Sequence, residues 1–307
     1  MINDIYVITG ATGNIGKRLA EKLLEAGKAV RVIGREAAKL SSLVDKGAIA
    51  FVGSLEDKAF LTKVFQDAKY LFAMIPPDHI AQDLRAFQNR VSKALVNAVK
   101  STNITHIVTL SSLGAHLPSG TGPILGLHDA EEHFNQLETV NVLHLRPTFF
   151  MENLLNGINT IKSLGINGSP QDPNIAVPMI ATKDIADVAF DVLNSPSFTG
   201  KITRELHGQR DLTILEATKV LGQSIGKPDL NYVQFSFEDA RKAMLTLGLS
   251  ANVVDTMLEM YHSINNGILT ATEVRSSQNT TPTTIEEFAK GVFAPAYGTN
   301  QSSSVNA

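Results

Sequence analysis

A glycine-rich turn between a strand-like and a helix-like segment, close to the start of the chain, constrains the fold most strongly. The segment 5–8 is a short apolar run typical of a buried parallel strand. Gly10, Gly13 and Gly16 follow at three-residue spacing and lead into a helical pattern. Gly10 would permit a tight exit from the strand, Gly13 a close backbone approach to a diphosphate, and Gly16 close packing of the helix. The N–H groups at the helix start would then attract phosphates.

Strand-like and helix-like segments continue to alternate through the first half of the chain. Short apolar runs are followed by longer segments whose apolar residues recur at helical spacing. Strands separated by helices of this length predict right-handed crossovers and a doubly wound parallel α/β sheet of the Rossmann type. The predicted strands are 5–8, 30–33, 49–52, 70–75, 106–110 and 142–145, and the predicted helices are 15–27, 36–46, 58–66, 78–99 (capped by Asp78) and 130–137.

Beyond Pro147 the alternation becomes less regular, which indicates a second structural unit. We expect a dinucleotide-binding domain at 1–156, completed by 177–194, whose helix 183–193 would pack on the main sheet. The remaining segments, 157–176 and 195–295, are expected to form a smaller substrate-binding lobe with strands at 202–207 and 232–237.

The end of the chain carries one helix-start signal and a polar tail. Thr283-Thr284-Ile285-Glu286 fits a capping box, which predicts that the last helix begins at Thr283. Residues 296–307 are rich in Ser, Asn and Gly, and we expect them to be disordered.

Composition and charge exclude several classes of function. The 307 residues include 27 Lys and Arg against 30 Asp and Glu, with no basic run, which excludes nucleic acid as the main partner. The absence of cysteine excludes disulfides, thiolate zinc ligands and a cysteine nucleophile. No signal peptide or segment of about 20 apolar residues is recognisable, so we expect a cytoplasmic protein without a membrane partner. The sequence leaves open whether the chain forms a homodimer.

Residues after the second and third predicted strands bear on which dinucleotide would bind. NAD sites usually place an acidic residue after the second strand for the ribose hydroxyls, whereas NADP sites place an arginine nearby. Here Arg35 stands at that position and Glu36 follows, so the pattern favours NADP over NAD without deciding between them. A solvated arginine without a ligand is the alternative. Arg18 and Lys39 are candidates to assist, and Ser54 is expected beside the adenine.

Four segments of the sequence form a recognisable set: 9–16 (Thr-Gly-Ala-Thr-Gly-Asn-Ile-Gly), Arg35, Ser111-Ser112, and 145–153 (Leu-Arg-Pro-Thr-Phe-Phe-Met-Glu-Asn). Together they resemble the NmrA-like family of atypical short-chain dehydrogenases/reductases, and the resemblance extends along nearly the whole chain. It implies the Rossmann fold and a nicotinamide cofactor. Members include NADPH-dependent quinone, azo-dye and triphenylmethane reductases as well as dinucleotide-sensing regulators, so the resemblance leaves the reaction open.

The ends of the central strands are the expected cofactor contacts, because doubly wound sheets bind ligands at the carboxyl ends of their strands. The prolines after the fourth strand would form a rigid wall beside the nicotinamide. The predicted cofactor-binding residues are Gly10, Thr12, Gly13, Asn14, Ile15, Gly16, Arg35, Ser54, Met74, Ile75, Pro76, Ser111 and Phe149.

The segment before the sixth strand lacks the catalytic pair of conventional short-chain dehydrogenases. Those enzymes use Tyr-x-x-x-Lys, in which the lysine lowers the pKa of the tyrosine. When Glu132 is aligned with the acid that commonly follows this pair, Ile124 stands at the tyrosine and His128 at the lysine. Because histidine titrates near neutrality, His128 is our candidate proton donor, a polar residue near a helix start being the alternative. Ser111 is the second catalytic candidate, and a simple strand-end turn is its alternative.

The remaining pattern favours a reductase. Ser112, Phe150 and Asn153 are the predicted substrate contacts, with core packing as the alternative for the phenylalanine. No metal site is expected, and no serine-hydrolase motif is present. A quinone needs little from the protein, because the anion formed by hydride addition is delocalised and can take its proton from water.

We therefore predict an NADPH-dependent reductase of a small planar electrophile such as a quinone. A non-catalytic NADP(H)-sensing regulatory protein is the main alternative. An isomerase or epimerase of an activated sugar is disfavoured by the missing tyrosine.

Overall fold

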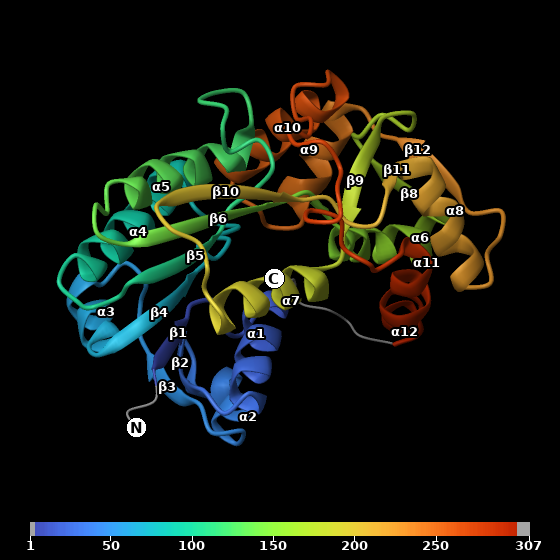
Figure 1. The fold of residues 1–307 in the computed structure, drawn as a ribbon. Helices are drawn as coiled ribbons and strands as arrows, with labels where there is room; N and C mark the ends of the chain where they lie inside the picture. The colour runs from blue at the N-terminus through green and yellow to red at the C-terminus, as the bar shows by residue number, and fades with distance from the viewer. Residues whose placement is uncertain (1–3, 300–307) are drawn as a thin grey trace.

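The computed structural model describes residues 4–299. Its main feature, within those residues, is a sheet of seven parallel strands in the order β10-β6-β5-β4-β1-β2-β3 (Figure 1). Six of them follow the order 3-2-1-4-5-6 common in dinucleotide-binding sheets, which confirms the predicted doubly wound fold. The strands are β1 Ile5–Ile8, β2 Ala29–Gly34, β3 Ile49–Val52, β4 Ala68–Ala73, β5 His106–Leu110, β6 Asn141–Pro147 and β10 Lys201–Leu206.

Helices cover both faces of this sheet (Figure 1). On one face α1 buries Ile15, Leu19 and Leu23, whose spacing places them on one side of the helix, and α7 packs beside it, as predicted. The other face is covered by α3, α4 and α5. The helices are α1 Asn14–Glu25, η1 Ala37–Leu40, α2 Ser41–Val44, α3 Lys58–Phe65, α4 Leu84–Val99, η2 Gly122–Ile124, α5 Leu125–Asn135 and α7 Thr182–Asn194.

The long helix after β4 begins later than predicted. Asp78 does not cap it: the Asp78 carboxylate accepts the N–H of Ile80 at 3.1 Å, which forms a turn, and Ile80 is 70% exposed. The helix starts at Leu84, because Asp83 accepts the N–H of Ala86 at 2.9 Å and satisfies its first turn. By sequence alone Asp78 and Asp83 could each cap this helix, but only Asp83 does so.

The strand predicted at 202–207 belongs to the main sheet and not to the smaller lobe. It is β10, which pairs in parallel with β6, with Ile202 opposite Leu143 and Leu206 opposite Pro147. Leu206 is fully buried in the same core cluster as α1 and α7. Leu206 and the apolar face of α7 are buried in one cluster, and this shared burial favours β10 as an extension of the main sheet.

The smaller lobe has its own apolar core, formed largely by α8, the π-helical turn η4 and the 151–161 segment. Two short sheets, β11-β9-β7 and β12-β8, lie in it (Figure 1). Its elements are β7 Phe149–Phe150, η3 Met151–Gly157, α6 Ile158–Leu164, β8 Ile166–Ser169, β9 Ala176–Ile180, β11 Asp211–Thr213, α8 Ile214–Ser224, β12 Asn231–Gln234, α9 Phe237–Thr246, α10 Ala251–Asn265, α11 Ile285–Phe288, η4 Ala289–Phe293 and α12 Ala294–Gly298.

Two expectations for the end of the chain need correction. The capping box lies one residue later than predicted: Thr284 caps α11 and pairs with Glu287. Thr283 instead donates its hydroxyl to the buried Asp184 at 2.5 Å, which ties this segment to α7. The predicted disordered tail is wrong for 296–298, which are helical, while 300–307 lie outside the described residues.

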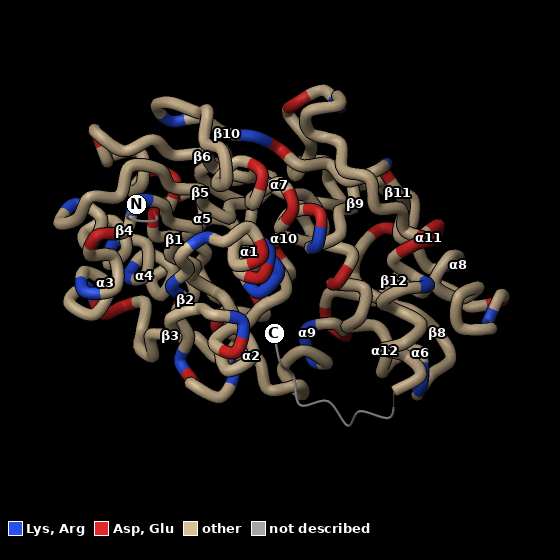
Figure 2. The backbone as a smooth tube through the Cα atoms, turned by 60° about the horizontal axis from the view of Figure 1, so that its bottom comes forward, with Lys and Arg blue, Asp and Glu red and all other residues tan. Residues whose placement is uncertain are grey.

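Positively and negatively charged residues are mixed along the chain. Figure 2 shows Lys and Arg interspersed with Asp and Glu over the main sheet and the smaller lobe. Within residues 4–299, no helix is long and apolar enough to span a bilayer.

Candidate functional site

The glycine turn forms an open cradle at the carboxyl end of β1. Gly10 has a φ of +63°, and a Cβ there would lie 2.5 Å from the Met74 sulfur, so only glycine fits without strain. A Cβ on Gly13 would meet its nearest atom, the Gly10 carbonyl oxygen, at 3.5 Å, and Thr12 and Asn14 are exposed. No side chain caps α1, so its first N–H groups are free to bind an anion.

The other two residues of the predicted cradle have packing roles. The Ile15 side chain is buried in the core, so only its backbone N–H faces the cradle. A Cβ on Gly16 would overlap the Gly10 carbonyl, which means that α1 packs directly on the turn. This is the close packing expected for the third glycine.

Thr9 fixes the end of β4 beside this cradle. The Met74 N–H donates to Thr9 Oγ1 at 2.7 Å, and the Thr9 hydroxyl donates back to the Met74 carbonyl at 2.9 Å. Thr9 is fully buried, so these hydrogen bonds are shielded from water. Met74, Ile75 and Pro76 therefore leave β4 along a defined path next to Gly10, at the edge of the cradle.

Arg35 is exposed after β2 and makes no hydrogen bond or ion pair within residues 4–299. Glu36 instead pairs with Lys39 at 2.7 Å. Arg18 is not available as an assistant to Arg35, because its guanidinium forms two hydrogen bonds to Asp187 on α7, at 2.9 and 3.0 Å. Arg35 is thus exposed and unpaired within residues 4–299, whereas Arg18 is held by α7.

Ser54 lies after β3 and is exposed. Its hydroxyl oxygen accepts the N–H of Glu56 at 3.1 Å, which leaves the hydroxyl hydrogen free to be donated. The prediction that it borders an adenine stays open.

A buried polar chain connects the end of β5 to α5 and β6. The Ser111 hydroxyl donates to Glu131 Oε1 at 2.5 Å, and Arg146 forms two hydrogen bonds to the same carboxylate, at 2.5 and 2.9 Å. Burial alone would raise the pKa of Glu131, but the bonds from Arg146 and Ser111 hold that pKa below its ordinary value. Because Glu131 stays ionised, the Ser111 hydrogen is committed to it and is not available for a substrate.

A cavity of about 10 Å³ lies beside this chain, lined by Thr109, Ser111, Glu131 and apolar residues. Such a volume holds at most about one water molecule. Next to it, His144 Nδ1 accepts from the Thr109 hydroxyl at 2.7 Å, and Nε2 donates to the side-chain oxygen Oδ1 of Asn135 at 3.0 Å. Burial lowers the pKa of His144 to about 4, so this ring is neutral near pH 7.

His128 lies on the first turns of α5 and is half-buried. Its Nδ1 is 2.8 Å from the Ala115 carbonyl oxygen. A carbonyl can only accept, so Nδ1 carries a hydrogen, and the neutral ring then presents Nε2 as an acceptor. Only the doubly protonated ring can donate from Nε2. Glu132 is exposed, whereas Ile124 is buried in the core of the smaller lobe.

The predicted substrate contacts Ser112, Phe150 and Asn153 lie near Phe149, which was predicted to contact the cofactor. Phe149 packs against the core of the smaller lobe and Phe150 against the core of the main sheet, so these residues join the two cores. Asn153 is exposed, and the Ser112 hydroxyl donates to the Leu113 carbonyl at 3.0 Å. None of these contacts decides whether the residues meet a substrate, and their assignment stays a prediction.

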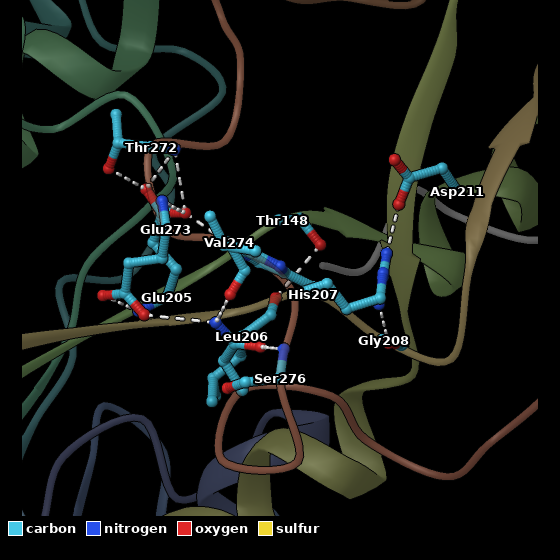
Figure 3. A network of polar contacts seen from close by, with 12 residues as sticks. Thr148, Glu205, Leu206, His207, Gly208, Asp211, Thr272, Glu273, Val274 and Ser276 are labelled. Atoms are coloured by element: carbon cyan, nitrogen blue, oxygen red, sulfur yellow. Dashed lines mark hydrogen bonds and ion pairs between the residues drawn. The ribbon is translucent and has the colours of Figure 1, made fainter.

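A second buried network lies at the end of β10 (Figure 3). Glu205 accepts the Thr272 hydroxyl at 2.7 Å, and its other carboxylate oxygen lies 2.8 Å from His207 Nε2. Figure 3 also shows Thr148 reaching the backbone of this strand, where its hydroxyl donates to the Leu206 carbonyl at 3.1 Å. These contacts tie the 272–279 segment to the main sheet.

Comparison with known families places the chain. The sequence profile described as the NmrA-like family matches residues 3–289. The chain belongs to the NmrA-like family. The resemblance seen in the sequence is therefore confirmed.

One relative and two structural neighbours of this NmrA-like protein carry reductase or oxidoreductase names. It is 28% identical over 261 residues to the NAD(P)H azoreductase of Xenophilus azovorans, which covers 84% of this chain and 86% of that protein. An NADPH-dependent quinone oxidoreductase of Escherichia coli superposes with a TM-score of 0.79, at 23% identity over 94% of this chain and 99% of that one. The triphenylmethane reductase of a Citrobacter species gives 0.76, at 20% identity with the same coverage. The two structural matches establish the shared fold.

Sequence reasoning missed Glu131 and Arg146 in this NmrA-like protein. Glu131 stands four residues after Leu127 and three before Phe134, which places it on the apolar face of α5. That periodicity could have identified it, and not Glu132, as the buried acid. Arg146 lies in the 145–153 segment that carried the family resemblance, but its side chain had no predicted role.

Within residues 4–299, no cluster of His, Asp and Glu is arranged to bind a metal.

Proposed function

We propose that this NmrA-like protein is an NADPH-dependent reductase of small planar electron acceptors such as quinones. The observation that carries the proposal is the uncapped N-terminus of α1 behind a glycine turn that leaves space for a diphosphate. The reductase names of the relatives support the reaction class.

The residues around the cradle fit a nicotinamide dinucleotide. The Gly13 N–H donates to the Gly10 carbonyl at 3.0 Å and shapes the turn, so the backbone N–H groups of Asn14 and Ile15 would hold the diphosphate at the start of α1. Because β4 and β5 lie on one side of β1 and β2 and β3 on the other, the nicotinamide would extend toward Met74 and Ile75. Ser54 would then lie on the adenine side. When bound, the reduced cofactor supplies a hydride.

We propose that Arg35 selects NADPH over NADH. Its guanidinium is exposed and has no protein partner within residues 4–299, and the nearest acidic residue along the chain, Glu36, is paired with Lys39. A guanidinium can form two hydrogen bonds to a 2′-phosphate, which NADH lacks.

The side chains available as proton donors favour an electron acceptor that does not need a positioned acid for its reduction. Ser111 is committed to Glu131, and the Tyr-x-x-x-Lys pair is absent at Ile124 and His128. This leaves the doubly protonated His128 ring, or water, to supply the proton. A delocalised acceptor such as a quinone tolerates both routes, whereas an isolated ketone needs a positioned acid.

The proposal is tested by cofactor binding and turnover in matched variants. Gly13→Asp places a carboxylate in the cradle, where its side chain meets no close backbone contact, and should abolish NADPH binding measured by calorimetry. Gly291→Asp adds the same charge at an exposed glycine of the smaller lobe and should bind normally. The wild type should consume NADPH with a panel of quinones. Normal binding by Gly13→Asp would overturn the proposed cradle.

One observation favours a second function, a dinucleotide-sensing regulator without catalysis. The protein lacks the conventional catalytic pair, and both serines after β5, Ser111 and Ser112, donate their hydroxyl hydrogens to protein acceptors. Tight binding of both NADPH and NADP⁺ with no turnover across quinones, azo dyes and triphenylmethane dyes would select this alternative.

A further inference from the structure

The segment that follows β4 reaches from the cofactor cradle to the α9–α10 hairpin. It begins at Met74, which Thr9 holds in place, and continues through Pro76 and Pro77, whose rings restrict the backbone. Asp78 then forms the turn at Ile80 described above. The path between the cradle and residues 79–84 is therefore short and conformationally restricted.

The N-terminus of α10 binds this segment through three hydrogen bonds. The Ser250 N–H donates to the His79 carbonyl at 3.0 Å, and its hydroxyl donates to the Ala81 carbonyl at 2.5 Å. Asn252 Oδ1 accepts the N–H of Leu84 at 2.8 Å, at the first residue of α4. Ala81 and Leu84 also pack on Val253 in a small separate apolar cluster.

The same helix contacts the segment that leads into α5. α10 packs against η2, and a Cβ on Gly122 would overlap the Thr256 carbonyl, so the two backbones are in direct contact. η2 runs directly into the turn of α5 that carries His128. α10 thus bridges the segment after β4 and the segment before His128, the two segments that would flank a nicotinamide.

The hairpin presents apolar side chains that are only partly buried. Ala240 is the one buried residue of α9, and α10 carries the half-buried Met257, Leu258, Met260 and Tyr261. Burial raises the pKa of the Tyr261 hydroxyl. Methionine side chains adapt to flat apolar ligands of different shape.

We infer that Ser250 and Asn252 are positioning residues, which hold the α9–α10 hairpin against the segment after β4 so that it forms the wall of the acceptor site. The inference rests on the proposed function, because that segment borders the cofactor. Nucleotide binding at the cradle then orders the hairpin through residues 75–84. Loss of either side chain leaves the cradle intact and loosens the wall.

The hydrogen-bonding roles of these two residues can be separated from simple helix capping. Asn252→Ala removes the acceptor for the Leu84 N–H, whereas Asn252→Asp keeps an oxygen at that position. Ser250→Ala removes both the α10 cap and the bond to Ala81. Ser236→Ala is its matched control, because Ser236 caps α9 in the same way and does not contact the segment after β4.

The first measurement is amide hydrogen exchange with and without NADP⁺, with nucleotide affinity measured by calorimetry. In the wild type, NADP⁺ should slow exchange in 253–264 by about fivefold or more, the lower end of usual coupling between two sites. Asn252→Ala and Ser250→Ala should lose this effect while binding NADP⁺ within about twofold. Asn252→Asp and Ser236→Ala should keep it.

The second measurement uses 2-methyl-1,4-naphthoquinone as the acceptor. Asn252→Ala should raise its KM by about 3- to 10-fold, as expected for loss of one hydrogen bond, with the KM for NADPH unchanged. NADP⁺ binding without slower exchange in 253–264 of the wild type would overturn this inference and leave the proposed function standing. Failure to bind NADP⁺ at all would overturn both.

Discussion

Ser111 donates its hydroxyl hydrogen to Glu131 across 2.5 Å, and both residues are buried. The serine at the carboxyl end of the central strand therefore serves the interior of the protein. Arg146 balances the charge of the carboxylate from the neighbouring strand. This arrangement assigns the proton of Ser111 to a structural ion pair.

Replacing Glu131 should destabilise the protein strongly. Glu131→Gln leaves the Arg146 charge without its partner, and breaking a buried ion pair costs about 3–5 kcal/mol of unfolding free energy. The matched control is Glu132→Gln at the neighbouring exposed position, which should change stability by less than about 0.5 kcal/mol. Urea denaturation measures both. Equal effects of the two substitutions would show that the buried pair contributes little.

Arg35→Ala should weaken NADPH binding and leave NADH binding unchanged. A hydrogen-bonded charge pair with the 2′-phosphate is worth about 1–3 kcal/mol, or roughly 5- to 150-fold in dissociation constant. Calorimetric titration of both nucleotides against the wild type and the variant measures the difference. Equal affinity of the wild type for NADH and NADPH would remove the assigned role.

His128→Asn should slow quinone reduction by about 100-fold if the ring donates the proton, with the KM for NADPH unchanged. Asparagine can still donate to the Ala115 carbonyl, so the loss would report the missing ring nitrogen and not a disrupted helix. Unchanged turnover would assign the proton to water.

His144 should make the protein less stable in mild acid. Its pKa is about 4 in the folded protein and about 6.5 in an unfolded chain, so between these pH values only the unfolded state takes up the proton. Stability should therefore be unaffected above about pH 6.5 and fall as the pH approaches 4, by an amount on the order of 3 kcal/mol.

His144→Gln should flatten this part of the stability curve, although it lowers stability at neutral pH by disturbing the bonds to Thr109 and Asn135. His262→Gln, at an exposed position, is the control and should keep the wild-type curve. Thermal unfolding measured between pH 4 and 8 gives the comparison. A wild-type curve that stays flat over this range would contradict the buried, neutral ring.

Local signals predicted the main sheet well. The glycine turn and the alternation of apolar runs with amphipathic helices depend on residues close together in the chain, and β1 to β6 follow them. β10 was misplaced because its sequence, Lys-Ile-Thr-Arg-Glu-Leu, carries little apolar signal to show whether it extends the main sheet or forms a separate one. The pairing with β6 depends on residues about 60 positions away.

The partners of the site residues were harder to predict than their positions. Arg35 is exposed, as a nucleotide-binding arginine must be, but nothing near Arg18 in the sequence indicates that Asp187 engages it. Likewise, Ser111 was located correctly at the β5 end, and its bond to Glu131 depends on how α5 rotates against the sheet. Such contacts follow from tertiary packing.

The course of the backbone also bears on how such a protein can diversify. The chain leaves the main sheet after β6, returns to it for α7 and β10, and enters the smaller lobe again at β11, where the last described helices also lie. That lobe is therefore not a contiguous cassette, and no single recombination event could exchange it for another. New acceptor preferences are expected to arise by point substitution and loop-length change, with α7 and β10 retained as anchors.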